Sequence, residues 1–290
     1  MRAIPLQRFL FTATLTCASR LVQIRDRLLN RVPRARPECA GIAATQHTIP
    51  SGKNLLDAAY VTPAPGETRA AVLICHGIGE IVPQWFPIQR ILAERGIASL
   101  VFDYSGYGHS TGWPGWNQCE DDAVAAFNLL KHLAPDLPIA LLGFSLGTGI
   151  VPAILDRVKA DRLVLCAGYS SFRKAARAAW LPGFLSPLVP PIWSAKDALR
   201  DCTLPILIVQ GDHDRLFRLP MAHDLLACCN GRADLLILPA HSHNEPFYNP
   251  QLHYWGPIVS WLLQDPTQDS NQRSNPEFQP GIKPANLLTC

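Results

Sequence analysis

The chain has 290 residues, of which 48% are hydrophobic and 17% are charged. This composition supports a large buried core and excludes an intrinsically disordered protein. The formal net charge of +3 gives no indication of a nucleic-acid partner. Residues 1–36 hold eight arginines and one acidic residue, so the basic character belongs to this N-terminal arm and not to the body of the chain.

The N-terminal arm carries an apolar stripe at helical spacing. Its members are Leu6, Leu10, Ala13, Cys17, Leu21, Ile24 and Leu28. The first interpretation is a helix that docks on the body of the protein. The second is a helix that lies on a membrane surface, with residues 1–31 making peripheral membrane contact. A targeting peptide is the third, because Arg20 interrupts the apolar stretch and no clear cleavage site follows.

Cysteine usage and hydropathy bear on the compartment. The chain has nine cysteines, an odd number, without a Cys-x-x-Cys pair or a cluster at zinc-ligand spacing. This pattern favours reduced thiols in a reducing compartment, so we expect a cytoplasmic protein without a metal. No run of eighteen apolar residues predicts an integral membrane span, which leaves the N-terminal arm as the candidate for membrane association.

Apolar runs and turn residues alternate from residue 46 to residue 264. A hairpin is expected over residues 46–62, around the turn Pro50-Ser51-Gly52-Lys53. Buried strands are predicted at 70–75, 97–102, 138–142, 161–166, 204–210 and 233–238. Helices are predicted at 85–95, 121–133, 146–158, 221–229 and 248–264. The alternation predicts an α/β domain, in which a mostly parallel central sheet is covered by helices on both faces.

Two segments depart from this alternation. Residues 172–200 are rich in proline and aromatic residues, which is typical of a short lid over a pocket. The alternative is a loop that packs on the body and gates nothing. Residues 265–290 are polar, contain proline and show no periodicity, so we expect a disordered or loosely packed tail.

The central motif is Gly143-Phe144-Ser145-Leu146-Gly147, which stands between a predicted strand and a predicted helix. This is the context of a nucleophile elbow, where a serine on a strained turn projects its hydroxyl above the sheet. Glycines on both sides allow the strand and the helix to pass close to each other. The backbone N–H of Leu146 would then face a developing oxyanion. The alternative is a glycine-rich strand end with a helix-capping serine.

A second glycine-containing loop follows the strand at 70–75, at His76-Gly77-Ile78. Its backbone could fold back toward Ser145, so that the N–H of Ile78 supplies a second oxyanion donor. We expect His76 to be a hydrogen-bonded residue that orients this loop and not a base. Asp103, at the end of the strand at 97–102, is expected to brace the loops. An ordinary glycine turn is the alternative.

An acid and a histidine follow the last two predicted strands. The first of these loops reads Gly211-Asp212-His213-Asp214, and the second reads His241-Ser242-His243-Asn244. Ligands of parallel sheets gather beyond the carboxyl ends of the strands, so these side chains are expected to meet Ser145 there. Position alone does not decide between Asp212 and Asp214, or between His241 and His243.

With these motifs, residues 46–264 resemble the α/β-hydrolase family. The matching segments are His76-Gly77, the loop 103–110, the Ser145 pentapeptide, Gly211–Asp214 and Ser242-His243-Asn244. Serine, acid and histidine occur in the chain order of that family. The family's Gly-x-x-Asp spacing favours Asp214, and its His-Asn pair favours His243. Ser105 departs from the pattern, because many relatives have a basic residue there.

The resemblance implies a serine hydrolase with the α/β-hydrolase fold and no cofactor. In that family His243 would take the proton from Ser145, and Asp214 would hold the imidazole. The N–H groups of Ile78 and Leu146 would bind the oxyanion. The implied reaction is cleavage of a small-molecule carboxylic ester or thioester through an acyl-enzyme, with no nucleic-acid partner. The apolar lid predicted at 172–200 suggests a short to medium acyl chain.

Three other functions remain open at this point. An acyltransferase would use the same three residues with an alcohol as acceptor, and a binding protein could share the fold without catalysis. A peptidase would need a group for a free amino terminus. Glu80 and Glu245 are candidates for that group, although each is explained more simply as a solvated loop charge.

Overall fold

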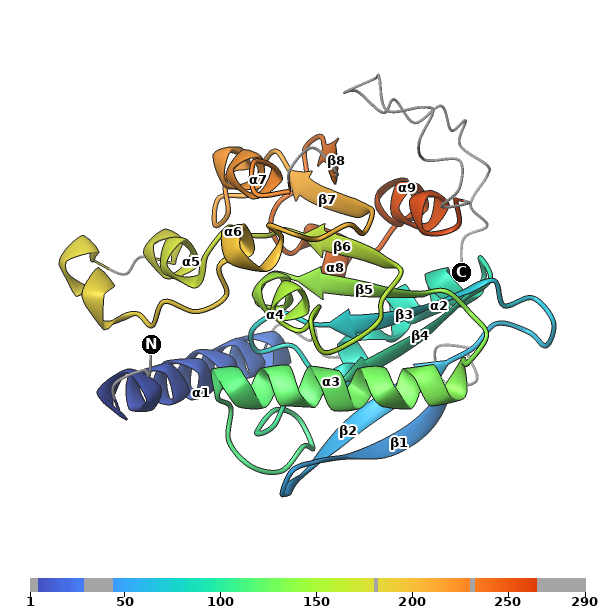
Figure 1. Ribbon diagram of the computed structural model, residues 1–290, viewed down its shortest axis with the longest axis horizontal. Helices are drawn as coiled ribbons and strands as arrows, with labels where there is room; N and C mark the ends of the chain where they lie inside the picture. Colours follow the sequence, from blue (N-terminus) through green and yellow to red (C-terminus); the bar gives the residue numbers. More distant parts are fainter. Residues whose placement is uncertain (1–4, 29–43, 180–181, 230–232, 265–290) are drawn as a thin grey trace.

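The computed structural model describes residues 5–28, 44–179, 182–229 and 233–264. The tail predicted for residues 265–290 and the end of the arm at residues 29–36 lie outside the described residues. An eight-stranded sheet, in the order β1-β2-β4-β3-β5-β6-β7-β8, forms the centre of the protein (Figure 1). Its first edge is the predicted hairpin, in which β1 (Ala44–Ser51) pairs antiparallel with β2 (Asn54–Val61).

The remaining strands form a parallel array, to which β2 is joined antiparallel through β4. They are β3 (Ala70–Cys75), β4 (Ile97–Phe102), β5 (Ile139–Phe144), β6 (Arg162–Cys166), β7 (Ile206–Gly211) and β8 (Ala233–Leu238). All side chains of β3, β4, β5, β6 and β7 are buried, which explains why these strands are continuous apolar runs in the sequence. The prediction of a mostly parallel sheet is confirmed.

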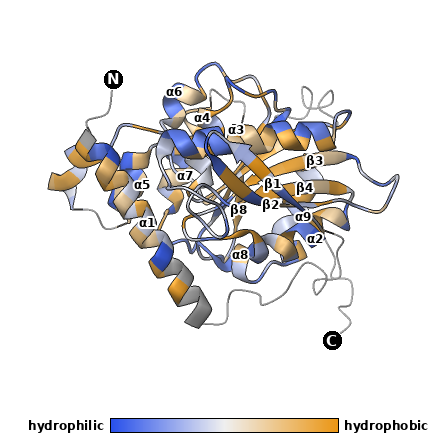
Figure 2. Ribbon diagram, turned by 90° about the horizontal axis from the view of Figure 1, so that it is seen from below, coloured by the Kyte–Doolittle hydropathy of each residue, from blue (hydrophilic) through white to orange (hydrophobic). Residues whose placement is uncertain are grey.

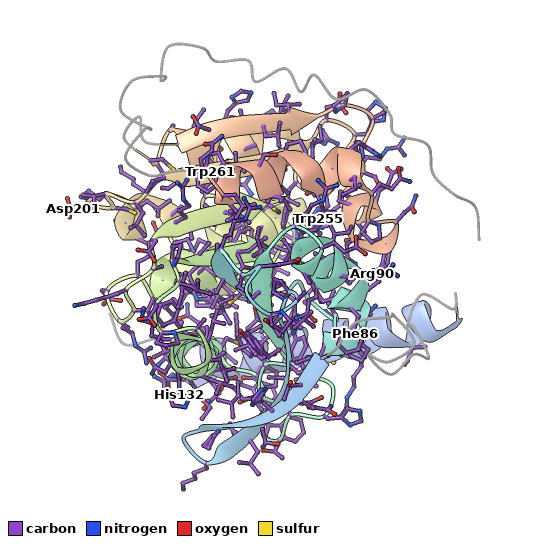
Figure 3. All side chains as sticks on the ribbon, turned by 90° about the vertical axis from the view of Figure 1, so that its right-hand side faces the viewer. Phe86, Arg90, His132, Asp201, Trp255 and Trp261 are labelled. Carbon is purple, nitrogen blue, oxygen red and sulfur yellow. The ribbon has the colours of Figure 1, made fainter. Side chains whose placement is uncertain are left out.

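Helices cover both faces of the sheet, as predicted. One face packs against α3 (Trp116–Leu133), α4 (Gly147–Ala153), α6 (Ala195–Ala198) and α7 (Leu219–Leu226). The other packs against η2 (Val82–Trp85), α2 (Phe86–Ala93), α8 (Glu245–Tyr248) and α9 (Leu252–Leu262). Figure 3 shows Phe86 of α2 and Trp255 of α9 in this second layer. Successive side chains of β3 alternate between the two cores, so each face of the sheet is apolar.

The predicted helices differ from the structure at their ends, and the helix after Ser145 shows a local cause. The helix after Ser145 was expected to reach residue 158, but α4 ends at Ala153. Pro152 has no N–H with which to continue the helical ladder, and the following turn closes on its carbonyl oxygen through the N–H of Ile154. The closing helix, expected within residues 248–264, is α9, which begins at Leu252 after the short helix α8 and a turn at Asn249.

The N-terminal arm forms α1 (Pro5–Leu28), which packs across the loops beyond the strand ends (Figure 1). The ring of Phe11 lies 5.3 Å from Trp116, 5.2 Å from Phe172 and 5.6 Å from Trp193. The last two residues belong to the segment predicted as a lid, which contains α5 (Phe172–Ala178), η3 (Gly183–Leu188) and α6. A gating role for this segment stays a prediction. Across the described ranges, no helix combines the length and hydropathy needed to cross a bilayer.

Candidate active site

The turn after β5 has the geometry of a nucleophile elbow. Ser145 has a φ of 49°, in the left-handed region that residues other than glycine rarely adopt. Its N–H donates to the Cys166 carbonyl on the neighbouring strand β6 at 3.0 Å. Its own carbonyl oxygen accepts from the Thr148 N–H at 3.0 Å and from the Thr148 hydroxyl at 2.6 Å. These bonds hold the strained turn in place and thereby set the position of the Ser145 hydroxyl.

The two glycines of the motif are required by close packing. A Cβ on Gly147 would overlap the carbonyl oxygen of Cys75 on β3. A Cβ on Gly143 would lie 2.6 Å from the carbonyl oxygen of Gly147, well inside van der Waals contact. Strand β5 and helix α4 therefore approach each other as closely as the backbone allows. This close approach is the reason for glycine at both positions that was expected from the sequence.

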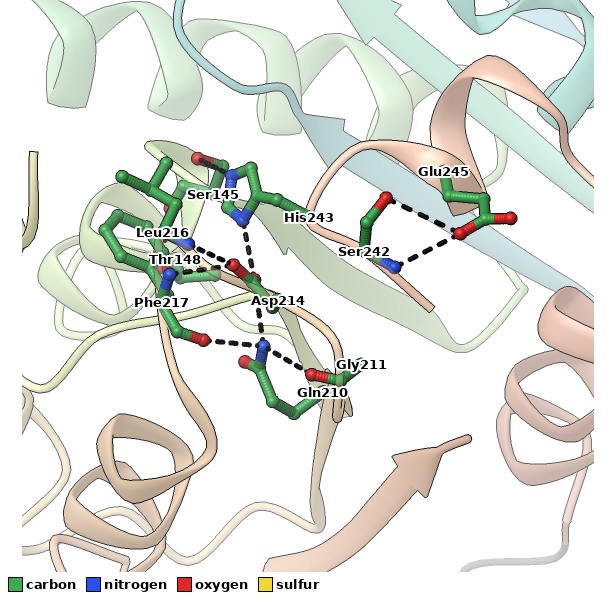
Figure 4. A network of polar contacts seen from close by, with 10 residues as sticks. All are labelled: Ser145, Thr148, Gln210, Gly211, Asp214, Leu216, Phe217, Ser242, His243 and Glu245. Atoms are coloured by element: carbon green, nitrogen blue, oxygen red, sulfur yellow. Dashed lines mark hydrogen bonds and ion pairs between the residues drawn. The ribbon is translucent and has the colours of Figure 1, made fainter. Parts of the chain in front are cut away.

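Three predicted residues from separate loops meet at the carboxyl edge of the sheet. His243 Nε2 lies 3.0 Å from Ser145 Oγ, and His243 Nδ1 lies 2.7 Å from Asp214 Oδ2 (Figure 4). Ser145 follows β5, Asp214 follows β7 and His243 follows β8. Ser145 and Asp214 are buried, at 6% and 3% exposure, and His243 is half-buried. This arrangement can hold the imidazole with its proton on Nδ1 and its free Nε2 facing the hydroxyl.

The competing acid and histidine have other partners. Asp212 Oδ1 accepts the N–H of Ala240 at 2.7 Å, which ties together the loops after β7 and β8. His241 places Nδ1 2.7 Å from the carbonyl oxygen of Pro239 and Nε2 2.8 Å from His253 Nε2. The structure thus brings Asp214 and His243 to Ser145, and it directs Asp212 and His241 elsewhere.

Gln210 is a residue of this site that the sequence analysis missed. Its Nε2 donates to Asp214 Oδ2 at 2.9 Å and to the carbonyl oxygen of Phe217 at 2.8 Å (Figure 4). The other carboxylate oxygen, Oδ1, accepts the N–H groups of Leu216 and Phe217, both at 2.8 Å. Both oxygens of the buried carboxylate are therefore satisfied. The available signal was a polar residue at the end of an otherwise apolar strand.

The two predicted oxyanion donors leave neighbouring strands at the same level. Strands β3 and β5 are parallel, with Cys75 opposite Gly143, and Ile78 and Leu146 each follow three residues later. Within the described part of the chain, neither of these two N–H groups donates to a protein acceptor. Their role as oxyanion donors stays a prediction.

His76 begins the loop that contains Ile78, and Asp103 follows β4. Both residues are fully buried. His76 Nδ1 lies 2.8 Å from the carbonyl oxygen of Gly77, and the ring packs 4.5 Å from that of Tyr104. Burial lowers the pKa of His76 to about 4, so it is neutral at pH 7. Asp103 Oδ1 accepts the N–H of Val82 at 2.9 Å, and burial raises the pKa of Asp103 to about 8. These contacts fit the structural roles expected of both residues.

Glu80 is not the solvated loop charge that the sequence suggested. It is only 5% exposed, and its Oε2 accepts the N–H of Gly77 at 2.7 Å and the indole N–H of Trp85 at 3.2 Å. The turn into η2 folds Glu80 under the His76-Gly77-Ile78 loop, where it fixes the backbone next to Ile78. Glu245 is exposed, as expected, and accepts the N–H of Ser242 at 3.2 Å.

An open hollow of about 740 Å³ lies beside His243. Residues of both the acid loop and the histidine loop line it, and they include Arg215, Ser242, Glu245 and Tyr248. Charges of both signs therefore face the space next to the histidine, beside apolar surface from residues such as Leu216.

Comparison with known proteins agrees with this geometry. Residues 66–201 match the model of a family described as serine aminopeptidase, S33. This segment contains Ser145 but ends before Asp214 and His243, so the match bears on the elbow and not on the other two residues.

Several proteins and solved structures are similar to this chain. An uncharacterized protein of Mycobacterium tuberculosis, MT2364, is 24% identical, over 72% of this chain and 79% of its own length. Lysophosphatidylserine lipase ABHD12 of Mus musculus is 26% identical over 79% of this chain, and the match spans 65% of that protein, less than two thirds. The esterase Pf2001 of Pyrococcus furiosus superposes with a TM-score of 0.65 at 17% identity, over 80% of this chain and 96% of its own.

These findings agree on one architecture. The mostly parallel sheet with helices on both faces is the one predicted for residues 46–264, and the matched segment 66–201 lies within that range. The chain therefore has the α/β-hydrolase fold, and its sequence is similar to proteins with that fold.

Proposed function

We propose that this protein is a serine hydrolase that cleaves a carboxylic ester or thioester through an acyl-enzyme on Ser145. The observation that carries the proposal is the continuous hydrogen-bonded series from Ser145 Oγ to His243, at 3.0 Å, and from His243 to Asp214, at 2.7 Å. A serine hydroxyl is a weak nucleophile until a neighbouring base accepts its proton, and an imidazole held in this way is such a base.

The reaction has two halves. His243 Nε2 takes the proton as Ser145 Oγ attacks the acyl carbonyl, and the tetrahedral intermediate collapses when the same proton passes to the leaving alcohol or thiol. Water then enters, His243 again acts as base, and the acyl group leaves Ser145 as a carboxylic acid. Asp214 keeps the proton of Nδ1 in place and stabilises the imidazolium in both halves. Its four donors hold it in one position throughout.

The oxyanion is assigned to the N–H groups of Leu146 and Ile78. Each donor of this kind contributes roughly 10²–10³ in rate, because it is oriented before the charge develops. The bonds to Thr148 support the first donor by fixing the elbow, and the bond from Gly77 to Glu80 supports the second by fixing its loop.

The hollow beside His243 has room for the leaving group of a substrate, between polar and apolar side chains. Arg215 and Glu245 supply charges of opposite sign around it. The names of two similar proteins refer to ester cleavage: the mouse protein is a lysophosphatidylserine lipase, and the Pyrococcus furiosus protein is an esterase. An acyltransferase would use the same residues with an alcohol in place of water. The peptidase alternative is weaker, because Glu80 is buried and already accepts two hydrogen bonds.

The decisive experiment is labelling with a fluorophosphonate probe, which reacts covalently with an activated serine. Wild type is compared with Ser145→Ala and with Ser170→Ala as the matched control. Ser170 is also 6% exposed and follows the neighbouring strand β6, but His243 makes no hydrogen bond to it. We expect labelling of wild type and Ser170→Ala, and none of Ser145→Ala.

Absence of labelling in folded wild type would overturn the proposal and favour the non-catalytic binding protein. Labelling that survives in Ser145→Ala would also overturn it, because the reactive nucleophile would then be another residue. A product assay then compares an acyl ester and an acyl thioester with an aminoacyl amide. Turnover of the amide alone would replace the esterase with a peptidase. Ester turnover that only an added alcohol accelerates, with a new ester as product, would identify an acyltransferase.

A further inference from the structure

Helix α1 has two apolar faces, and only one of them is covered by the protein. The docked face contains Phe11 and Leu15, which are 3% and 2% exposed. The opposite face holds most of the stripe predicted from the sequence, with Phe9 beside it, and four large side chains there point away from the body. Their exposed fractions are 54% for Leu6, 69% for Phe9, 67% for Leu21 and 54% for Ile24. Burial on the body therefore leaves the predicted stripe of α1 uncovered.

Neighbouring segments extend this uncovered surface. Trp113 is 67% exposed and shares a shallow apolar hollow of about 280 Å³ with Phe9 and Ala13. In η3, Phe184 is 81% and Leu188 is 42% exposed, and the Gln7 side chain joins η3 to α1 by donating to the Pro187 carbonyl oxygen at 3.3 Å. We call these side chains the outer apolar face, which comprises Leu6, Phe9, Leu21, Ile24, Trp113, Phe184 and Leu188. Figure 2 shows apolar residues along α1, with α5 beside it.

The N-terminal segment that carries this face has a positive net charge in the sequence. Arg20 is exposed on α1 between Phe9 and Leu21, and residues 1–36 contain eight arginines against one acidic residue. Long arginine side chains can keep their charge at the level of lipid headgroups while the apolar residues beside them enter the acyl region. Basic residues next to an apolar helix face complement an anionic membrane surface.

The dimensions suit a helix that lies in the membrane interface. With 24 residues, α1 is about 36 Å long. Leu6 and Ile24 stand near its two ends, so the apolar stripe runs along most of the helix axis. A side chain such as Trp113 is typical of the headgroup level, because its ring is apolar and its N–H is polar.

We propose that the outer apolar face is a docking surface for an anionic lipid bilayer, with α1 lying flat in the interface. Phe11 on the docked side of α1 contacts Trp116 and Phe172, which follow the ends of β4 and β6. The bilayer would therefore meet the protein at the edge of the sheet that carries Ser145. The proposal concerns binding alone and does not depend on the reaction at Ser145.

Flotation of the full chain with lipid vesicles tests the proposal. The vesicles contain either phosphatidylcholine alone or phosphatidylcholine with phosphatidylglycerol. Wild type is compared with the double variant Leu21→Ser/Ile24→Ser. The matched control is Ile237→Ser/Leu252→Ser, which removes two side chains of 41% and 46% exposure outside α1 and η3. Circular dichroism and thermal melting verify that each variant is folded.

We expect wild type to float with the anionic vesicles and less with the neutral ones. Removing two inserted aliphatic side chains should lower the partition coefficient by tenfold or more, since burial of each contributes roughly a factor of ten. The control variant should bind like wild type. Arg20→Glu should selectively reduce binding to the anionic vesicles.

Two results would overturn the proposal. One is wild type that remains in the soluble fraction with anionic vesicles, and the other is equal flotation of the α1 variant and its control. A second copy of the chain is the other possible partner of this face, and sedimentation without vesicles tests for it. If wild type forms a dimer that Leu21→Ser/Ile24→Ser dissociates and no flotation occurs, the face is an interface between two copies. Fluorophosphonate labelling in the absence of lipid reports Ser145 separately, so failure of docking and failure of catalysis are distinguishable.

Discussion

Gln210 donates a hydrogen bond to Asp214, with 2.9 Å between Nε2 and Oδ2, from a position that is fully buried. The same carboxylate oxygen lies 2.7 Å from His243 Nδ1. The orientation of the amide is determined by its surroundings, because the carbonyl oxygens of Gly211 and Phe217 also face Nε2 and can only accept. Gln210 therefore positions the acid and touches neither Ser145 nor His243 in the bonds described here.

Replacing Gln210 with Met should lower kcat with little change in KM. Methionine has a similar size but no donor, so Asp214 loses one of the bonds that hold it toward His243. A hydrogen bond to a charged group contributes about 1.5–3 kcal/mol, which corresponds to a loss of roughly tenfold or more in kcat. Steady-state kinetics with a soluble ester measure this effect.

Gln89→Met is the matched control for that variant. Gln89 is also fully buried, and its Nε2 donates to two carbonyl oxygens, those of Ala59 and Ser99, neither of which belongs to the candidate active site. Both variants should lose stability, but only Gln210→Met should lose turnover. Equal turnover of the two folded variants would show that Gln210 has no positioning role.

Asp214→Asn should reduce kcat by about 10³–10⁴ while the protein stays folded. An asparagine amide cannot hold the imidazole in the tautomer that leaves Nε2 free to accept a proton. Asp212→Asn should retain turnover, because Asn can still accept the N–H of Ala240 through its own oxygen. Parallel kinetics of the two variants decide which aspartate serves His243, and a larger loss in Asp212→Asn would reverse the assignment.

Gly147→Ala should destabilise the protein by about 3 kcal/mol, because the new methyl group overlaps the Cys75 carbonyl oxygen and forces β3 away from the elbow. Gly183→Ala in η3 is the control, since a Cβ there would have no neighbour within 4 Å. Its stability should stay within about 0.5 kcal/mol of wild type. Urea unfolding of the three proteins provides the comparison, and equal midpoints would contradict the close contact of β3 with α4.

The buried His76 should make the protein less stable as the pH falls from 6.5 to 4. Burial lowers its pKa from 6.5 to about 4, so in this range the unfolded chain binds a proton that the folded protein does not. The contribution present above pH 6.5 is thus lost on acidification, by on the order of 3 kcal/mol. His76→Gln removes the titrating group, and the difference in unfolding free energy between wild type and the variant should shrink across this window. A difference that is constant from pH 7 to pH 4 would show that His76 titrates normally in the folded state.

The sequence by itself determined the architecture and the chemistry of the loops. Strands buried on both faces are apolar at almost every position, so β3 and β4 could be predicted to the residue from their composition. The bounds of β8, an edge strand with exposed Asp234 and Ile237, also matched the prediction. The elbow could be recognised because a strand and a helix that nearly touch leave room only for glycine on either side of Ser145. The pattern of serine, acid and histidine followed from loops that all leave the same edge of a parallel sheet.

Only the tertiary structure decided which of several similar residues meet. Asp212 and Asp214 differ by two positions in one loop, and it is the packing of the loop after β8 that turns Asp214 toward His243 and Asp212 toward Ala240. Gln210 and Glu80 are buried, and their hydrogen-bond partners depend on how the loop after β7 and the turn before η2 fold. Local periodicity reports none of these contacts.

Helix α1 shows the same division most clearly. Its sequence has apolar residues on two opposite faces, and periodicity identified the stripe that contains Leu6 and Leu21. The body instead covers Phe11 and Leu15, because three aromatic rings on α3 and the lid segment form a site that matches the phenyl ring of Phe11. Which face of an amphipathic helix docks is a property of the surface that receives it, and that surface exists only once the chain has folded.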